Sequence, residues 1–332
     1  MIVNPSVPPV VVLGAGVSGL SSGVELLLRG YQVEIWARDP PAATTSAVAG
    51  AVWFPFHAAP AERVGAWAKE TYDRLAELSI DPESGVTMRE GVLCDPDLSD
   101  GSTWRPAVRA LREAGQGDLP HGRQGEIFAA PIAEMPIYLE YLHRRFVAFG
   151  GVLHLRALTS VSEAFAETDR VVNCTGLGAR ELFNDPEVYP VRGQLVRISG
   201  VELKRWYLDE KGRDGISYII PRSEDIVLGG TVEPNNEDLT PVPSDTERII
   251  ARCSRFAPNL VEGHVVAQSV GLRPGRPAIR LEVEEVDERH GVIHNYGHGG
   301  SGLTLSWGCA REVADLADRR WGVANQPPDS GA

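Results

Sequence analysis

The glycine-rich segment Gly14-Ala15-Gly16-Val17-Ser18-Gly19 has residue types and spacing that could bind a dinucleotide. In this pattern the first glycine makes a tight turn, the second lets a pyrophosphate approach the backbone, and the third lets a helix pack closely on a strand. Free N–H groups at the start of the following helix would then face the negative charge of the phosphates. The pattern predicts a dinucleotide site, with a simple tight turn as the alternative.

Arg38 and Asp39 lie where dinucleotide-binding proteins usually carry the acidic residue that binds a ribose, about 20 residues after the glycines. Arg38 could bind a 2′-phosphate, which would make the cofactor NADP. It could instead pack against an adenine while another residue binds the ribose, or it could form a solvated pair with Asp39. This motif alone leaves the identity of the cofactor open.

Three further segments carry small or hydroxyl-bearing residues that could complete such a site. Thr44-Thr45-Ser46 could bind phosphate oxygens. The run Ala49-Gly50-Ala51-Val52, followed by Trp53-Phe54-Pro55-Phe56, would let backbone N–H groups approach a flat ring, with a loop beside an aromatic core as the alternative. Val171-Val172-Asn173 indicates a strand that ends in the turn Cys174-Thr175-Gly176-Leu177-Gly178, and nucleotide crevices gather such turns at the ends of strands.

The histidines and cysteines do not indicate a metal site. His294 and His298 are four residues apart, a spacing that suits metal ligands on a helix. Here they flank a strand end and a glycine turn, so we expect packing or hydrogen bonding and no bound metal. Cys94, Cys174, Cys253 and Cys309 form no CxxC pair, which is typical of scattered buried thiols in a reducing cytoplasm.

The elements that must position these residues alternate between strand and helix. The unbroken apolar run Val10-Val11-Val12-Leu13, a helix stopped by Gly30 and a strand over 33–37 form a βαβ unit, which predicts a parallel sheet. Residues 191–232 alternate apolar and polar in short pieces, as in an antiparallel sheet. Residues 81–130 predict short strands and loops. Further helices are expected over 60–80, 137–149, 244–255 and 303–320, and further strands over 153–155, 170–174 and 291–296.

Composition excludes several classes of protein. The chain has 332 residues, enough for about two domains. With 32 Lys and Arg against 45 Asp and Glu, the net charge of −13 argues against nucleic acid and anionic membranes as partners. No apolar run approaches the ~18 residues of a membrane span. No secretory signal is visible, so we expect a cytoplasmic protein.

Three later motifs resemble one known family. They are Tyr218-Ile219-Ile220-Pro221, Gly271-Leu272-Arg273-Pro274-Gly275-Arg276-Pro277 and the long segment Val292-Ile293-His294-Asn295-Tyr296-Gly297-His298-Gly299-Gly300-Ser301-Gly302-Leu303-Thr304-Leu305-Ser306-Trp307-Gly308-Cys309-Ala310. Together with the opening glycines they resemble the D-amino-acid oxidase family, which includes D-aspartate oxidase. The resemblance runs from about residue 10 to 320. Ala37-Arg38-Asp39 and the small-residue and aromatic segment after Ala49 look most like microbial members.

The resemblance implies an α/β fold with two domains. A Rossmann-type FAD-binding domain would be joined to a substrate domain built on a mixed, mainly antiparallel sheet. We assign residues 1–56, 137–190 and 266–322 to the FAD-binding domain and residues 57–136 and 191–265 to the substrate domain. Residues 323–332 would be a flexible tail.

The resemblance also implies an activity and its residues. FAD would accept a hydride at N5 from a D-amino acid, with O2 as the final acceptor, giving a 2-oxo acid, ammonia and H2O2. Arg273 would clamp the substrate carboxylate through two charge-assisted bonds, Tyr218 would bind the same carboxylate, and the Gly300 carbonyl would take the amine. The apolar Phe54 and Phe56, with Ser301, would line the substrate pocket and favour neutral or apolar D-amino acids.

The cofactor-binding residues implied by the resemblance come from several separate segments. They are Gly14, Ala15, Gly16, Val17, Ser18, Gly19, Arg38, Thr44, Thr45, Ser46, Gly50, Ala51, Val52, Leu158, Thr175, Gly176, Arg273, Gly299, Gly300, Gly302, Leu303 and Thr304. The last three would begin a helix whose positive end stabilises negative charge on the reduced flavin. The expected partners are the D-amino acid and O2, and a homodimer is compatible with the sequence.

The chain departs from the family in two places, which leaves the substrate open. Some members have a second active-site tyrosine before the Tyr218 motif, where this chain has the short Lys211-Gly212-Arg213-Asp214-Gly215, so a smaller lid or none is expected. Ser301 takes a place that is aromatic in some relatives. A D-aspartate oxidase would need another cation, from Arg213, Arg222 or His57. The sequence is also compatible with a glycine or sarcosine oxidase, an NADP-dependent dehydrogenase or a non-catalytic flavoprotein.

Overall fold

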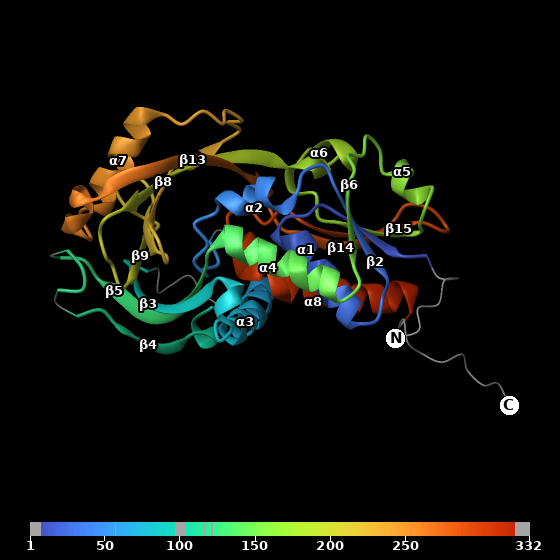
Figure 1. Cartoon of the computed structure of the whole chain (residues 1–332), viewed down its shortest axis with the longest axis horizontal. Coiled ribbons are helices and arrows are strands. Elements are labelled where there is room, and N and C mark those ends of the chain that lie inside the picture. The colour runs from blue at the N-terminus through green and yellow to red at the C-terminus, as the bar shows by residue number, and fades with distance from the viewer. Residues whose placement is uncertain (1–7, 57, 97–103, 116, 121, 323–332) are drawn as a thin grey trace.

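The structure is a computed structural model that describes residues 8–56, 58–96, 104–115, 117–120 and 122–322. His57 and the expected tail at 323–332 therefore lie outside the described residues. The chain builds two sheets, with the six-stranded sheet on the right of Figure 1 and the nine-stranded sheet on the left. The predicted α/β fold class is confirmed.

The six-stranded sheet contains the predicted βαβ unit. Its strand order is β14-β15-β7-β1-β2-β6, and every neighbouring pair is parallel except β14 with β15. The strands are β1 (Val10–Leu13), β2 (Val33–Ala37), β6 (Val152–Leu155), β7 (Arg170–Asn173), β14 (Arg280–Glu285) and β15 (Gly291–Tyr296).

Both faces of this sheet are covered, which explains the unbroken apolar run in β1. Val10 and Val12 belong to the large core with the long helices, whereas Val11 and Leu13 pack in a separate core with Ala164 on the other face. Alternate side chains of a strand point to opposite faces, so a strand buried on both sides needs no polar position. Apart from α7, which belongs to the other sheet, the α-helices of the described residues are α1 (Val17–Leu28), α2 (Thr45–Val48), α3 (Ala61–Leu78), α4 (Met135–Ala148), α5 (Ser162–Phe165), α6 (Ala179–Leu182) and α8 (Gly302–Trp321).

The nine-stranded sheet is antiparallel except for the parallel pair β3 and β9, which confirms the predicted mixed, mainly antiparallel sheet. The path β12-β8-β11-β10-β9-β3-β5-β4 is joined by β13, which pairs with β8. Helix α7 (Pro243–Cys253) packs on β8, β10 and β11. The strands are β3 (Val86–Cys94), β4 (Arg109–Glu113), β5 (Gly125–Ala133), β8 (Tyr189–Ser199), β9 (Trp206–Asp209), β10 (Ser217–Pro221), β11 (Ile226–Gly229), β12 (Glu233–Pro234) and β13 (His264–Gly275).

The prediction of short strands over 81–130 was wrong for β3 and β5, which are 9 residues each and pair along their whole length. Gly91 lies inside β3. A Cβ there would stand 2.0 Å from the Trp206 ring, whose Nε1 donates a hydrogen bond to the Arg89 carbonyl. The glycine makes room for a buried tryptophan that crosses the strand.

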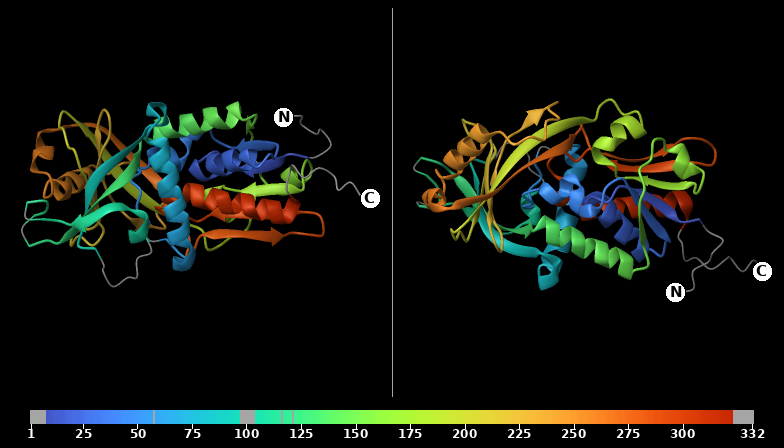
Figure 2. Two further views of the ribbon diagram at one scale, coloured as in Figure 1. Left: turned by 90° about the horizontal axis from the view of Figure 1, so that it is seen from below. Right: turned by 45° about the horizontal axis from the view of Figure 1, so that its top comes forward.

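Helix α3 joins the two halves of the molecule. It packs on α8 and on strands β3 and β5, and the left view of Figure 2 shows it between the helices of one sheet and the strands of the other. The long strand β13 lies in the nine-stranded sheet, although the sequence assignment groups residues from 266 onward with the FAD-binding segments. The domain boundaries stay a prediction. None of the helices in the described ranges has the length and apolar character needed to cross a membrane.

Candidate active site

A cavity of about 960 Å³ lies between the two sheets. Leu13, Ala37, Cys174 and Tyr296 line it at the C-terminal ends of β1, β2, β7 and β15, where open parallel sheets bind their ligands. Its other end is lined by side chains of the nine-stranded sheet. We call these two regions the nucleotide end and the substrate end.

The predicted glycine turn shapes the nucleotide end through close backbone contacts. Gly14 has a φ of +106°, and a Cβ there would lie 2.6 Å from the Cys174 carbonyl oxygen. A Cβ on Gly16 would lie 3.1 Å from Ser46 Oγ, which accepts a hydrogen bond from the Val17 N–H. Gly19 does not line the cavity, because its Cα faces the Gly14 carbonyl and a Cβ would stand 1.9 Å from that oxygen.

Two helices begin at the cavity with unpaired backbone donors. Within the described residues, the N–H groups of Ser18 and Gly19 in α1, and of Gly302, Leu303 and Thr304 in α8, have no backbone or side-chain acceptor. Such donors and the helix dipole favour negative charge. The start of α8 is held by Thr304 Oγ1, which accepts from the Phe54 N–H at 3.1 Å and donates to the Phe54 carbonyl at 2.9 Å.

His294 is part of a buried hydrogen-bond chain. Thr175 Oγ1 donates to Asn173 Oδ1, Asn173 Nδ2 lies 3.1 Å from His294 Nδ1, and His294 Nε2 lies 2.8 Å from a Glu284 oxygen. Burial lowers the pKa of His294 to about 4, so the ring is neutral and donates to Glu284 through Nε2–H. No cluster of residues able to hold a metal ion occurs in the described part of the chain.

His298 lines the cavity and is also buried, and burial alone lowers its pKa to about 4. His298 Nε2 and Asn295 Oδ1 are buried without a hydrogen-bond partner among the residues described. Buried polar atoms normally have a partner. Together with the unpaired helix donors and the glycine turn, they fit a large ligand with polar groups along its length.

Arg38 and Asp39 lie at the rim of the cavity, just after β2, where dinucleotide-binding proteins usually carry an acidic residue. The Arg38 side chain is 81% exposed and pairs with Asp39 at 2.8 Å, which corresponds to the solvated pair among the three interpretations. Arg156, which sequence reasoning missed, places its guanidinium 4.1 Å from the centre of the Trp36 ring and also lines the cavity.

The substrate end brings together the predicted Arg273 and Tyr218. The Arg273 guanidinium lies close enough to Tyr218 to act on its hydroxyl electrostatically, and it donates from Nη1 to the Thr231 carbonyl at 3.2 Å. A Cβ on Gly193 would stand 2.2 Å from Arg273 Nη1, so the glycine makes room for the guanidinium. Burial raises the pKa of Tyr218, so its hydroxyl keeps its proton at neutral pH, although Arg273 acts in the opposite direction.

Gly300 lies beside these two residues. A Cβ on Gly300 would be 2.9 Å from Phe56 Cδ1 and 3.7 Å from Arg273 Cδ. Ser301 does not line the cavity as predicted, because its hydroxyl donates to the Phe56 carbonyl at 2.8 Å and is buried. Ser301 therefore supports Phe56 from behind. Apart from Gly19 and Ser301, every predicted site residue lines the cavity.

Sequence reasoning missed most of the apolar wall at the substrate end. These side chains are Leu195, Leu208, Ile216, Ile220 and Leu239. They come from separate strands and loops, so no single motif contains them. Ile220 could have been found, because it lies two residues after Tyr218 in β10 and so shares its face.

Comparison with known proteins defines the class of enzyme. The family model described as FAD dependent oxidoreductase matches residues 9–316, so the chain belongs to this family and its cofactor is FAD. The NADP-dependent alternative is thereby set aside, and the predicted FAD is confirmed.

Similar curated proteins are D-amino-acid oxidases, which confirms the resemblance found in the motifs. The enzyme of Rubrobacter xylanophilus is 48% identical over 92% of this chain and 95% of its own length. The enzyme of Streptomyces coelicolor is 40% identical over 93% of this chain and 96% of its own. Among solved structures, glycine oxidase from Geobacillus kaustophilus matches with a TM-score of 0.79 and 19% identity, covering 96% of this chain and 99% of its own, which shows the shared fold.

Proposed function

We propose that this enzyme oxidises neutral and apolar D-amino acids to imino acids, with O2 as acceptor and H2O2 as second product. Water then hydrolyses the imino acids to 2-oxo acids and ammonia. The observation that carries this proposal is the half-buried pair of Arg273 and Tyr218, which lies beside Gly300 in an otherwise apolar end of the cavity. The 40–48% identity to D-amino-acid oxidases supports the same substrate class.

The chain's own groups would bind and orient the substrate. Arg273 and the Tyr218 hydroxyl would hold the carboxylate, because a guanidinium and a neutral phenol offer donors at one place. The Gly300 carbonyl would accept a hydrogen bond from the amine. FAD, when bound, supplies the hydride acceptor and passes the electrons to O2. Fixing both polar ends of the substrate orients its Cα–H bond, which is the main contribution we assign to the protein.

The cofactor would lie along the nucleotide end. The unpaired N–H groups at the start of α1 would face its phosphates, and those of Gly302, Leu303 and Thr304 would face negative charge on the reduced flavin. Thr44, Thr45 and Ser46 form the turn against Gly16. The cytoplasmic location and the homodimer stay predictions from the sequence.

The lining of the substrate end supports apolar side chains over D-aspartate. Phe54, Phe56, Leu208 and Ile216 line it. The Arg222 guanidinium, a candidate second cation, does not line the cavity and is paired with Asp225 at 2.7 Å. Arg213 does not line it either. Among the described residues, a side-chain carboxylate would therefore find neither of these arginines as a counter-charge in an apolar region, which is costly.

Anaerobic reduction of the bound flavin tests the proposal. D-valine, D-alanine, D-phenylalanine, D-aspartate, glycine and sarcosine are added without oxygen, with the L-enantiomers as controls. We expect rapid bleaching with D-valine and D-phenylalanine, slower bleaching with D-aspartate and none with L-valine. Fastest bleaching by D-aspartate, by glycine or by an L-amino acid would overturn the assigned substrate class.

A further inference from the structure

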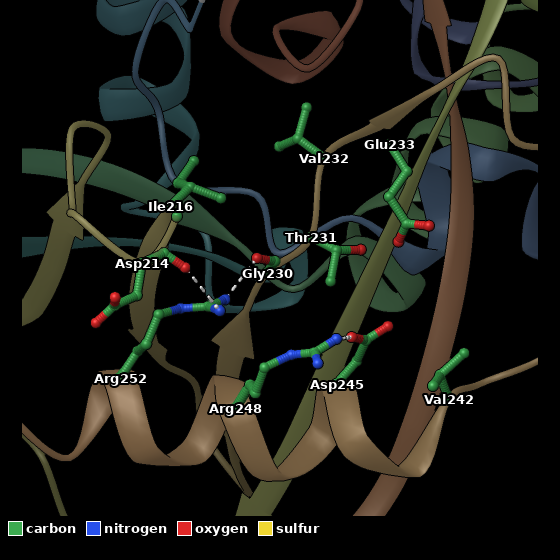
Figure 3. A pocket seen from close by; sticks show the side chains of 11 residues that line it. Asp214, Ile216, Gly230, Thr231, Val232, Glu233, Val242, Asp245, Arg248 and Arg252 are labelled. Atoms are coloured by element: carbon green, nitrogen blue, oxygen red, sulfur yellow. Dashed lines mark hydrogen bonds and ion pairs between the residues drawn. The ribbon is translucent and has the colours of Figure 1, made fainter.

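Arg252 of α7 is a buried cation outside the residues that line the active-site cavity. It is 9% exposed and has no carboxylate partner among the described residues. Its Nη2 donates to the Gly230 carbonyl at 2.8 Å and its Nη1 to the Asp214 carbonyl at 3.2 Å (Figure 3). Two nearby arginines differ, since Arg248 of the same helix pairs with Asp245, and Arg255, just after the helix, pairs with the Asp214 carboxylate. A buried guanidinium directed at two carbonyls fixes the backbone that carries them.

The first of these carbonyls belongs to the turn that supports the Arg273–Tyr218 pair. A Cβ on Gly229 would lie 1.8 Å from Tyr218 Cζ, and one on Gly230 would lie 2.9 Å from the Tyr218 hydroxyl oxygen, so these glycines lie against the ring. The next residue, Thr231, offers its carbonyl to Arg273 Nη1 at 3.2 Å. The Gly230–Thr231 turn therefore connects the two arginines. Arg252 donates to the Gly230 carbonyl, and Arg273 donates to the Thr231 carbonyl.

The second carbonyl belongs to the short segment between β9 and β10, where the sequence suggested a small lid or none. Ile216 ends this segment, and its carbonyl accepts a hydrogen bond from the Gly230 N–H at 3.3 Å. Ile216 lines both the active-site cavity and a second cavity of about 360 Å³ beside Arg252 (Figure 3). Arg252 thus ties the Asp214 segment, the Gly230 turn and α7 together behind the substrate end.

We infer that Arg252 is a positioning residue for the carboxylate clamp. It holds the Gly230–Thr231 turn at the place where the Thr231 carbonyl orients the Arg273 guanidinium and where the two glycines support the Tyr218 ring. This inference rests on the proposed function, in which Arg273 and Tyr218 bind a carboxylate. Arg252 itself touches neither the substrate nor the cofactor.

Benzoate, a carboxylate with an apolar ring and no oxidisable Cα–H, is a suitable probe of the clamp in the FAD-loaded enzyme. Its Kd is measured from the change in the flavin absorbance for the wild type, Arg252→Ala, Arg252→Lys and Arg248→Ala. We expect Arg252→Ala to raise the benzoate Kd and the KM for D-valine at least about tenfold, since bonds from a charged donor are lost. The Kd for FAD should change less than about twofold. Arg248→Ala removes an arginine from the same helix and pocket without a bond to Gly230, and it should behave as the wild type.

Chemical rescue separates positioning from general support of the fold. The cavity beside Arg252 leaves space for a free guanidinium ion once the side chain is shortened. Millimolar guanidinium chloride should lower the benzoate Kd of Arg252→Ala and leave that of Arg248→Ala unchanged. If Arg252→Ala does not fold, Arg252→Lys decides, because lysine can reach one carbonyl and should raise the Kd about threefold.

Three results would overturn the inference. They are a wild-type benzoate Kd in Arg252→Ala, a wild-type Kd in Arg252→Lys when the alanine variant is unfolded, and a loss of benzoate affinity matched by an equal loss of FAD affinity without rescue. Arg273→Ala separates this failure from failure of the proposed function. If Arg273→Ala loses benzoate and Arg252→Ala does not, only the role of Arg252 is wrong. If Arg273→Ala binds benzoate normally, the clamp itself is wrong.

Discussion

The nucleotide end and the substrate end of the cavity are built in different ways. At the nucleotide end, turns that are continuous in sequence present backbone N–H groups, and glycines allow close approach at Gly14 and Gly16. At the substrate end, Tyr218 of β10 lies close to Arg273 of β13, and the Arg273 guanidinium packs against Gly193 of β8. A backbone site can therefore be encoded by local spacing, whereas a side-chain site depends on how distant strands pair.

The largest effect should come from removing the cation of the substrate end. Arg273→Ala should weaken the transition-state binding that kcat/KM for D-valine measures by roughly 2–5 kcal/mol, because the substrate carboxylate loses its charged partner. The variant should keep its yellow colour, since the glycine turn and the helix donors of the nucleotide end are unchanged. Steady-state kinetics and the visible spectrum measure both.

Arg222→Ala is the matched control for that variant. Arg222 is similarly buried but pairs with Asp225 outside the cavity, so its loss should lower the Tm and leave kcat/KM nearly unchanged. If Arg273→Ala and Arg222→Ala had equal kcat/KM, Arg273 would act no differently from an arginine outside the cavity, and its role in binding the carboxylate would be wrong.

Two buried histidines, one lining the cavity and one behind its wall, should make the protein sensitive to acid. His294 and His298 have a pKa of about 4 in the folded protein against 6.5 for the free side chain, so the unfolded chain binds more protons between these values. Stability is therefore lost as pH falls through this window, by about 2 kcal/mol for each histidine between pH 6.5 and 5. Urea unfolding of the FAD-loaded enzyme at pH 7 and pH 5 measures it, and His298→Asn should remove about half of the difference. An unchanged difference in that variant would show that His298 is not the titrating group.

Two glycine substitutions, one at each end of the cavity, should affect different constants: the Kd for FAD at the nucleotide end and the KM for the substrate at the substrate end. Gly14→Ala forces a Cβ within 2.6 Å of the Cys174 carbonyl at a φ of +106°, and Gly193→Ala places one 2.2 Å from Arg273 Nη1. Such overpacking costs about 1–3 kcal/mol. Gly14→Ala should weaken FAD binding, whereas Gly193→Ala should keep FAD and raise the KM for D-valine. Gly115→Ala, at an exposed position, should change neither constant, and a rise in the FAD Kd for Gly193→Ala would contradict the separation.

The smallest effect should come from the contact between α8 and Phe54. Thr304→Val removes the two hydrogen bonds of the buried hydroxyl and should cost about 1–2 kcal/mol of stability. Thr87→Val, on the exposed face of β3, is the control. A Tm for Thr304→Val equal to that of Thr87→Val would mean that the hydroxyl does not hold the start of α8.

The sequence predicted the elements whose causes are local. The βαβ unit and the helix from Gly302 follow from apolar spacing and glycine stops, and both are present. It did not predict β3 and β5 correctly, because Gly91 serves Trp206 from a distant part of the chain. Tyr218 was assigned to the same carboxylate as Arg273 by resemblance, whereas the Thr231 carbonyl that holds Arg273 was not predicted. The wall formed by Leu195, Leu208 and Ile216 and the support from Arg252 depend on strand pairing, which no local pattern encodes.

The most direct test of the carboxylate clamp removes the carboxylate from the substrate as well as the cation from the protein. Anaerobic flavin reduction by D-valine and by D-valinamide is compared in the wild type and in Arg273→Ala. We predict that the wild type prefers D-valine by a factor of roughly 30 or more and that Arg273→Ala reduces with both at similar rates, because one interaction is lost by either change. If Arg273→Ala keeps the wild-type preference for D-valine, another group binds the carboxylate and the central assignment is wrong.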